Sequence, residues 1–368
     1  MKILHILTGF YPIRGGVETL IESLSDELEK SDGISSVFIA PRYWKSRPND
    51  FQYKSRRVYS IDMIHYGRRS ITAQLKGAKV AMKSFNDLRG IIENEKPDLV
   101  HVHGVFELFA AATKIANDLR IPIIHHIHGE LPRNFDVRKQ AILRASTSII
   151  AVSNKVAQSI ARHAPEVKIS VIPNGVADPG RANSFDKISR ITFIGRLEEQ
   201  KGLHIAMQAF AKSIQRYPDL HLNIVGLGDH IYFQELTNNL GISGSVSFFG
   251  RCSHFETLKV LKSSQLVIVP STSIEGFSMV AAEANIMSLP VIASDVGGLS
   301  NTILHQVTGL LVPPSDAEAL QEAIHFYLEN PNSARKHGTA GRARMIGEFS
   351  IMQYSRLIEN YYRLQVGK

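Results

Sequence analysis

The stretch "SRITFIGRLEEQKGLHIAMQAFAKSIQRY" at residues 189–217 contains a strand pattern, a short polar loop and a helix pattern in succession. Its first part, "SRITFIGR", has the apolar and β-branched residues that are typical of a buried strand. Its last part, "LHIAMQAFAKSIQRY", repeats apolar residues at helical spacing. A strand followed by an amphipathic helix is the unit from which parallel sheets covered by helices are built.

The same alternation runs through the chain on both sides of this stretch. Further strand patterns are "KILHIL", "SSVFIAP", "DLVHVHG", "IPIIHHIHG", "SIIAVS", "HLNIVGLG", "VSFFG", "LVIVPS", "PVIASD" and "LLVPPS". Helical patterns separate most of them. The sequence therefore predicts an α/β protein with two Rossmann-like, doubly wound domains that face each other across a cleft. We expect ligands at the carboxyl ends of both sheets.

A linker composition marks the boundary between the two domains. The stretch "VIPNGVADPGRANSFDKISR" at residues 171–190 is rich in proline, glycine, asparagine and serine. A chain of 368 residues is also long for a single core. We expect one domain over residues 1–172 and a second that begins at residue 173.

Composition narrows the class of protein. The net charge of +8 favours anionic partners such as nucleotides, nucleic acids or membrane surfaces. Basic strands interleaved with aromatic residues, of the kind that binds RNA, are missing, so we expect no nucleic-acid partner. The single cysteine, Cys252, excludes an internal disulfide. With no signal peptide or apolar run of membrane-spanning length in the sequence, we expect a cytoplasmic location.

Two glutamates stand eight positions apart in "IEGFSMVAAE", at residues 274–283. If a helix starts after "LVIVPS", Glu275 lies at its entrance and Glu283 about two turns further on. First-turn amides have no intrahelical partner and form an anion site, here the amides of Phe277, Ser278, Met279 and Val280. A nucleotide-sugar has its parts in the same order. Its sugar would lie at Glu275, its diphosphate at the amides and its ribose at Glu283. The alternative is an acid favoured by the helix dipole plus an unrelated surface glutamate.

The loop "GRLEEQKG" ends one strand with Arg196 and places Lys201 just before a helix. An arginine fork and a lysine point charge commonly clamp phosphate. The alternative is a solvated loop in which Glu198 and Glu199 pair with the two cations.

Glycines and histidines supply weaker candidates in the first half. Gly15 and Gly16 follow the first strand, where backbone can approach a phosphate closely, although the motif is not GxGxxG. Histidine pairs end two strands in "HVHG" and "HHIHG". Each pair, His101 with His103 and His126 with His128, shares a strand face and could bind zinc, fill the core or, at His128, face a substrate.

Several motifs in order resemble the retaining glycosyltransferases of the GT-B fold called family 4, or glycosyltransferase group 1. They are "GFYPIRGGVE", "HVHG", "HIHG", "IPNGV", "GRLEEQKG", "GLGD" and "EGFSMVAAE", followed by "VIASDVGGLSNTI" and "TGLLVPP". The closing "FSIMQYSRLIENYYRLQ" is similar to the family's terminal helix. The resemblance implies that residues 173–349 bind the nucleotide-sugar and that the helix of residues 350–368 packs back on the acceptor-binding first domain.

The resemblance also implies roles for single residues. Glu275 and His128 would contact the donor sugar, and Glu283 the ribose. Arg196 and Lys201 would stabilise the leaving diphosphate without a metal, since the chain has no Asp-x-Asp pair. The remaining donor-binding candidates are Gly15, Gly16, Gly226, Arg251, Phe277, Ser278, Met279 and Val280, with the base near "FFGR".

Three functions fit these features to different degrees. The first is a retaining, metal-independent glycosyltransferase that moves a sugar, expected from a UDP-sugar, to a glycan or lipid-linked glycan acceptor in surface polysaccharide synthesis. The second is a catalytically inactive regulatory protein that binds nucleotide-sugars on the same fold. The third, a nucleic-acid binder, lacks the sequence features described above.

A basic segment suggests a membrane surface as a further partner. Residues 42–84 hold eleven basic and two acidic residues. Leu75, Ala78, Met82 and Phe85 recur there at helical spacing beside a stripe of lysines. A basic amphipathic surface of this kind can hold a protein on an anionic leaflet, here the inner face of the plasma membrane. The alternative is an apolar stripe that faces the core and lysines that are simply solvated.

Overall fold

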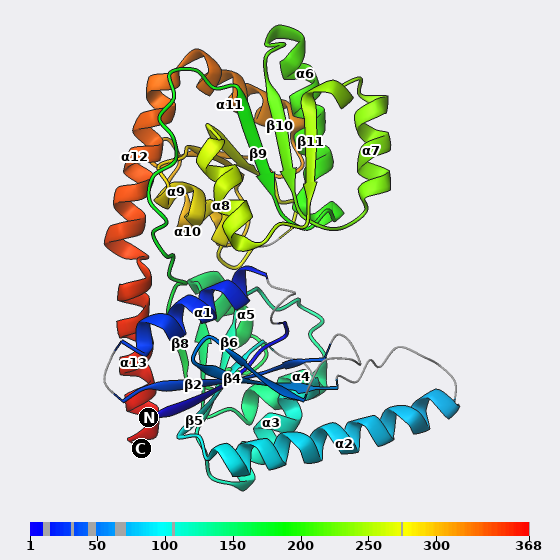
Figure 1. The fold of residues 1–368 in the computed structure, drawn as a ribbon, viewed down its shortest axis with the longest axis vertical. Helices are drawn as coiled ribbons and strands as arrows, with labels where there is room; N and C mark the ends of the chain where they lie inside the picture. Colours follow the sequence, from blue (N-terminus) through cyan, green and yellow to red (C-terminus); the bar gives the residue numbers. More distant parts are fainter. Residues whose placement is uncertain are drawn as a thin grey trace. The chain divides into compact units, whose positions relative to one another are not determined.

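The computed structural model describes residues 1–9, 15–30, 33–42, 49–62, 71–104, 107–273 and 275–367, without the side chains of 71–79 and 107. The chain divides into two compact units (Figure 1). Unit 1 comprises Met1–Pro173 and Met352–Lys368, and unit 2 comprises Asn174–Ile351.

Unit 1 is built on a sheet in the order β3-β4-β2-β1-β5-β6-β7-β8. Its strands are parallel except for β3, which pairs antiparallel with β4 at one edge. The bounds are β1 Lys2–Ile6, β2 Ser35–Pro41, β3 Asp50–Tyr53, β4 Arg56–Ile61, β5 Leu99–His103, β6 Ile123–Ile127, β7 Ser148–Ala151 and β8 Ile169–Val171. The order reverses between β1 and β5, as in a doubly wound fold.

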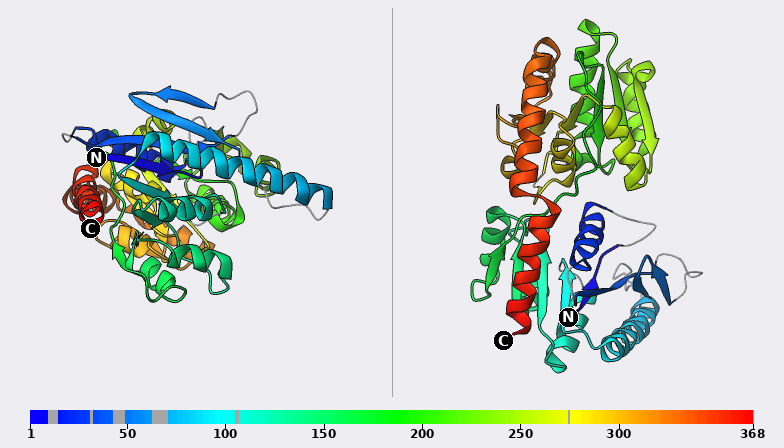
Figure 2. Two further views of the ribbon diagram at one scale, coloured as in Figure 1. Left: turned by 90° about the horizontal axis from the view of Figure 1, so that it is seen from below. Right: turned by 60° about the vertical axis from the view of Figure 1, so that its left-hand side comes forward.

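Helices cover both faces of this sheet. They are α1 Gly16–Leu28, α2 Ile71–Glu95, α3 Glu107–Asp118, α4 Val137–Arg144, α5 Asn154–Ala161 and α13 Ile351–Val366. On one face, Leu4, Val100 and Val102 form a core with residues of α2 and α3. The alternate residues of β1 and β5, among them His5 and His101, point to the other face because strand side chains alternate. There the C-terminal helix α13 reaches His101, and both chain ends lie on unit 1 (Figure 2).

Unit 2 has a parallel sheet in the order β11-β10-β9-β12-β13-β14. The bounds are β9 Arg190–Ile194, β10 His221–Val225, β11 Val246–Gly250, β12 Leu266–Val269, β13 Val291–Ser294 and β14 Leu310–Val312. The order reverses between β9 and β12, so this sheet too has a topological switch point. The predicted α/β class with two Rossmann-like units is confirmed.

The helices of unit 2 pack on both faces of that sheet. They are α6 Leu203–Arg216, α7 His230–Asn239, α8 His254–Ser263, α9 Met279–Ile286, α10 Leu299–Thr302, α11 Ala317–Glu329 and α12 Pro331–Glu348, with short 3-10 turns at Glu199–Lys201 and Ser243–Ser245. Phe193, Ile224, Ile268, Phe210 and Tyr327 anchor the core between the sheet and helices α6, α7 and α11. No helix among the described residues is both long and apolar enough to span a bilayer.

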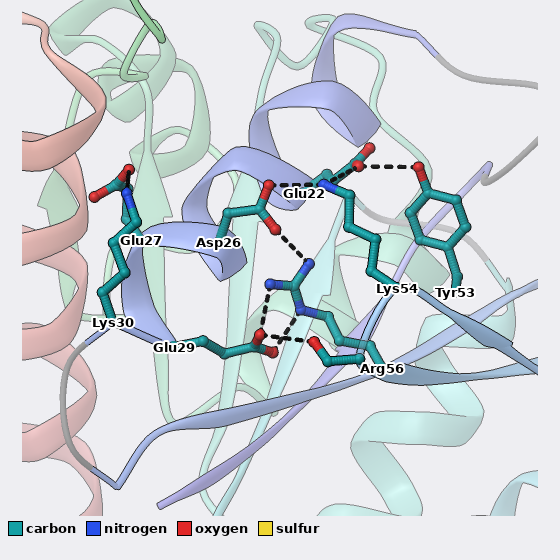
Figure 3. A network of polar contacts seen from close by, with 9 residues as sticks. Glu22, Asp26, Glu27, Glu29, Lys30, Tyr53, Lys54 and Arg56 are labelled. Atoms are coloured by element: carbon teal, nitrogen blue, oxygen red, sulfur yellow. Dashed lines mark hydrogen bonds and ion pairs between the residues drawn. The ribbon is translucent and has the colours of Figure 1, made fainter.

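The hairpin of β3 and β4 corrects the interpretation of the basic segment. Arg56 is almost fully buried and forms ion pairs with Asp26 and Glu29 of α1, while Lys54 pairs with Asp26 and Glu22 (Figure 3). These acids lie outside residues 42–84, so a charge count over the segment alone missed them.

Other cations of the segment are also paired. Arg42 and Lys83 both contact Asp62, and Arg57 contacts Asp50. On α2, Met82 is exposed, whereas Phe85 packs against the core. Lys45, Arg47, Arg68 and Arg69, and the side chains of Leu75, Lys76, Ala78 and Lys79, lie outside the described part of the chain.

Candidate active site

The carboxyl ends of β9 and β12 meet at the switch point of unit 2, where ligands of such sheets usually bind. The loop after β9 carries Arg196 and Lys201, and the segment after β12 carries Glu275. The backbone holds these two loops together, because Thr272 donates its N–H to the carbonyl of Gln200 at 3.0 Å.

Glycines allow these loops to pack backbone against backbone. Gly202 has φ +71°, and a Cβ there would lie 1.8 Å from the carbonyl oxygen of Pro270. Gly226 has φ +150°, and a Cβ there would lie 1.7 Å from the carbonyl oxygen of Gly195. The structure thus gives Gly226 a packing role. Its predicted role in donor binding stays a prediction.

Lys201 and Glu275 form the central pair of the site. The ammonium Nζ of Lys201 lies 2.5 Å from Oε1 of Glu275, and the Ser271 hydroxyl donates to the same oxygen at 2.8 Å. The lysine side chain is 29% exposed and the glutamate side chain 16%. Among the described residues, both contacts fall on Oε1, which leaves Oε2 of Glu275 for an external donor.

The backbone of Glu275 is fixed by a glycine turn that sequence reasoning did not single out. Gly298 donates its N–H to the carbonyl of Glu275 at 2.5 Å. A Cβ at Gly297 would lie 2.1 Å from the carbonyl oxygen of Glu275, and a Cβ at Gly298 would lie 1.9 Å from that of Gly276, so both positions exclude a side chain. The signal in the sequence is the "GG" of "VIASDVGGLSNTI".

Arg196 sits differently from Lys201. Its guanidinium donates to Oε1 of Glu198 at 2.7 Å, and its side chain is 66% exposed. This pairing with a neighbour is the one that the solvated-loop alternative expects. A phosphate clamp by Arg196 requires the guanidinium to exchange Glu198 for the ligand.

Helix α9 begins later than the sequence suggested. Ser278 is its N-cap and accepts from the N–H of Ala281, so the first helical residue is Met279. Phe277 precedes the helix, and its ring lies 5.5 Å from that of Phe349 in the interior of unit 2. The expectation that Glu275 stands at the helix entrance with Phe277 in the first turn is therefore wrong. The amides of Met279 and Val280 remain at the helix start.

Glu283 is a buried carboxyl on α9. Its nearest ionisable partner among the described residues is His254, whose Nδ1 lies 3.8 Å from Oε1. Burial raises the pKa of Glu283 to about 7. A ligand hydroxyl that donates a hydrogen bond to this buried carboxyl would stabilise its charged form and so favour binding of the ligand.

The predicted base region is described in full, whereas the first loop is described only in part. Gly226 donates its N–H to the carbonyl of Gly250, and Arg251, which follows β11, is exposed. In unit 1, Gly15 is the N-cap of α1 and Gly16 its first residue, with the N–H of Gly15 donating to Glu18. Residues 10–14, which complete that loop, lie outside the described chain.

His128 follows β6 at the carboxyl edge of unit 1. Its Nε2 lies 3.3 Å from Nδ1 of His103. The predicted pairs share their faces, with ring centroids 4.1 Å apart for His101 and His103 and 4.2 Å apart for His126 and His128. Burial lowers the pKa of His101, His103 and His126 well below the usual value.

Among the described residues, two groups of histidines have nitrogens close enough to share a metal ion. They are His5 with His101 and His103, and His103 with His126 and His128. Neutral imidazole is a common metal ligand, and burial lowers the pKa of His5, His101, His103 and His126. That the protein works without a metal stays a prediction.

The fold and site define a class, the GT-B glycosyltransferases, and the comparisons identify the family. The model of "Glycosyltransferase Family 4" matches residues 14–178, and that of "Glycosyl transferases group 1" matches residues 178–344. An uncharacterized glycosyltransferase of Methanocaldococcus jannaschii is 30% identical over 366 residues, with 90% of each chain covered. The chain belongs to the family 4 glycosyltransferases.

Other proteins are similar to this chain at lower identity. The glycogen synthase of Mycobacterium tuberculosis is 27% identical over 274 residues. The aligned part covers 69% of this chain and 66% of the glycogen synthase. The sucrose-phosphate synthase of Thermosynechococcus elongatus superimposes with a TM-score of 0.82 at 22% identity, covering 99% of this chain and 98% of the other. HepE of Anabaena, solved in complex with UDP-glucose, gives 0.77 at 19% identity, covering 98% and 99%.

Proposed function

We propose that this protein is a retaining glycosyltransferase that moves a sugar from a nucleotide-sugar, expected to be a UDP-sugar, to a glycan or lipid-linked glycan acceptor in surface polysaccharide synthesis. The observation that carries the proposal is the pair of Lys201 and Glu275 at the switch point of unit 2, together with the buried carboxyl of Glu283 on α9. HepE of Anabaena, which shares the fold, has been solved with UDP-glucose bound.

In this proposal, each residue acts on a different part of the donor. Oε2 of Glu275 accepts from sugar hydroxyls, while Lys201 keeps the carboxylate in place and faces the diphosphate. Lys201, Arg196 and the amides of Met279 and Val280 stabilise the charge that builds on the leaving phosphate. Glu283 accepts from ribose hydroxyls, and the transfer needs no metal. Retention and the contact of His128 with the sugar rest on the family alone.

The division of labour between the two glutamates gives a direct test. Glu275→Gln should reduce turnover more than nucleotide affinity, and Glu283→Gln should do the reverse. Thermal shifts with UDP, GDP, ADP and dTDP report affinity and base preference, because a tight ligand stabilises the folded state. Release of nucleotide from UDP-sugars reports turnover. Equal loss of affinity in both variants would contradict the assignment.

The alternative is a regulatory protein that binds nucleotide-sugars without turning them over. The same assays separate the two functions, since a regulator would show thermal shifts with nucleotides and no release of nucleotide with any acceptor. A second proposal concerns location: peripheral attachment to the anionic inner face of the plasma membrane through residues 42–84, where a lipid-linked acceptor would be presented.

A further inference from the structure

Ser271 is a second partner of the Glu275 carboxylate, besides Lys201. It lies two residues after the end of β12 and is only 1% exposed. Its hydroxyl lies 2.8 Å from Oε1 of Glu275. A carboxylate in an ion pair carries no proton and can only accept, so the serine must donate this hydrogen bond. The proposed function gives Ser271 no role.

Lys201 contacts the same oxygen but is the less rigid of the two partners. Its side chain is 29% exposed, and its ammonium lies at the end of a flexible four-carbon chain. In the proposed function this ammonium also faces the leaving diphosphate. A cation that is shared between a carboxylate and a bound diphosphate can move toward either anion. Lys201 alone therefore does not fix the direction of Glu275 while the donor is bound.

The residues on both sides of Ser271 are held in place by the loop after β9. On one side, Gly202 packs against the carbonyl of Pro270 so closely that a Cβ has no room. On the other side, Thr272 donates its N–H to the carbonyl of Gln200 at 3.0 Å. A short, buried side chain between two such residues keeps its hydroxyl in one place. The hydroxyl is also neutral, so a diphosphate attracts it far less than it attracts an ammonium.

We propose that Ser271 is a positioning residue that holds Oε1 of Glu275, so that Oε2 stays directed at the donor sugar when a bound diphosphate draws Lys201 away. The backbone of Glu275 is fixed separately by the N–H of Gly298. Ser271 supplies the remaining constraint, which acts on the side chain. The link to a sugar rests on the proposed function, whereas the coupling of Ser271 to Glu275 does not.

The competing explanation is that the bond only satisfies a buried hydroxyl, since an unpaired one would cost stability. Ser213 of α6 is an example of that ordinary case. It is equally buried and donates at the same distance, 2.8 Å, but its acceptor is the carbonyl of Ala209 in its own helix. Ser213→Ala is therefore the matched control for the loss of one buried hydroxyl in unit 2.

Unfolding of the whole chain without substrate tests the hydrogen bond itself. Urea denaturation is measured for Ser271→Ala, for Glu275→Ala and for the double variant. We expect Ser271→Ala to change the free energy of unfolding in the wild-type background and to have a smaller effect once Glu275 is replaced. Equal effects in the two backgrounds would show that the side chains are not coupled and would overturn the proposal.

Turnover and nucleotide affinity test the positioning role. Ser271→Ala should lower kcat for release of nucleotide from UDP-sugars about tenfold to a hundredfold, because a misdirected carboxylate acts on the sugar. Its affinity for UDP, which lacks the sugar, should match that of wild type. Ser271→Thr keeps a hydroxyl and should restore part of kcat, and Ser213→Ala should retain all of it.

Unchanged kcat in Ser271→Ala, or an equal fall in Ser213→Ala, would reject the positioning role. If wild type releases no nucleotide from any UDP-sugar, the proposed function fails, while unfolding still decides whether Ser271 and Glu275 are coupled. If wild type is active and only the Ser271 variants behave as wild type, the proposed function stands and the positioning role fails. The two failures are therefore distinguishable.

Discussion

Glu283 shows most clearly how one residue links stability to binding. Among the described residues, the nearest ionisable partner of this buried carboxyl is a histidine at 3.8 Å, so its ionised form costs folding free energy and its pKa rises to about 7. Proteins tolerate such a group where a ligand later supplies the missing hydrogen bonds. The buried carboxyl thus lowers the stability of the ligand-free fold and favours the binding of a ligand that carries hydroxyl groups.

The raised pKa predicts a pH-dependent gain in stability for Glu283→Gln. The folded state binds the proton more tightly than the unfolded state, whose pKa is 4.5. The stability from the protonated acid is therefore present below pH 4.5 and lost as the pH rises through 7. At pH 8.5 the variant should be more stable than wild type by about 3 kcal/mol, and near pH 4.5 about equal.

Urea denaturation at both pH values measures this difference. Glu322→Gln, at an exposed position of α11, is the matched control and should change stability little at either pH. Equal stabilities of wild type and Glu283→Gln at pH 8.5 would show that the carboxyl is not held in an unfavourable state.

The two cations of the site should differ in their effect on transfer. Lys201→Ala removes the partner of Glu275 as well as the proposed contact with the leaving phosphate, so we expect turnover to fall about 10²–10³-fold. Arg196→Ala removes an exposed group that pairs with Glu198. We expect its turnover to fall by a large factor, but by less than that of Lys201→Ala. Arg190→Ala is the control, because Arg190 lies at the amino end of β9, the strand that Arg196 follows. Full turnover in both site variants would remove these residues from the mechanism.

At the scale of elements, glycines at the carboxyl ends of the unit 2 strands decide how closely the loops approach. Gly226 packs against the backbone carbonyl of Gly195, Gly202 against that of Pro270, and Gly298 against that of Gly276. Each contact is between backbones, where a side chain has no room. These contacts fix the loops that carry Lys201 and Glu275 without help from a ligand.

Gly226→Ala should therefore destabilise unit 2 by about 2–4 kcal/mol, because it combines an unfavourable φ with a backbone clash. Gly241→Ala separates the two causes. Gly241 has φ +68° but nothing within 4 Å of a built Cβ, so only the conformational cost of about 1–2 kcal/mol applies. Denaturant unfolding of both variants gives the comparison, and equal losses would argue against crowding at Gly226.

The sequence predicted elements better than contacts. Apolar strand patterns identified β1 and β9 because parallel strands are buried on both faces. The hairpin of β3 and β4 was missed, since its polar residues are neutralised by acids of α1 that are distant in sequence. The pairing of Lys201 with Glu275, 74 positions apart, was likewise not legible from spacing. The start of α9 was misplaced because Ser278 caps it.

At the scale of the whole molecule, the net charge is +8, but ion pairs within the fold neutralise part of the basic residues locally. In unit 1, α1 supplies the acids that pair with Lys54 and Arg56 of the hairpin. These cations, together with Arg42 and Arg57, are engaged within the unit. The positive charge available to an external anionic surface is therefore smaller than the count over residues 42–84.

Six cations of residues 42–84 lie outside the ion pairs of the described chain, and the proposed membrane attachment is tested at four of them, Arg68, Arg69, Lys76 and Lys79. Each basic residue near an anionic surface contributes about 1 kcal/mol before screening, so four give reversible, salt-sensitive binding. We expect wild type to co-sediment with anionic liposomes at low salt, less at high salt, and not with neutral liposomes. Changing all four residues to Gln should abolish the binding.

A second quadruple variant separates this local effect from net charge. Lys212, Lys259, Lys262 and Lys336 are exposed in unit 2, and changing them to Gln removes the same number of charges elsewhere. If both variants lose binding equally, attraction follows the overall charge and no particular surface is involved. If wild type ignores anionic liposomes at low salt, the attachment proposal is wrong. Loss confined to the first variant would mean that residues 68–79 hold the first domain on the leaflet, where the lipid-linked acceptor of the proposed function would be presented.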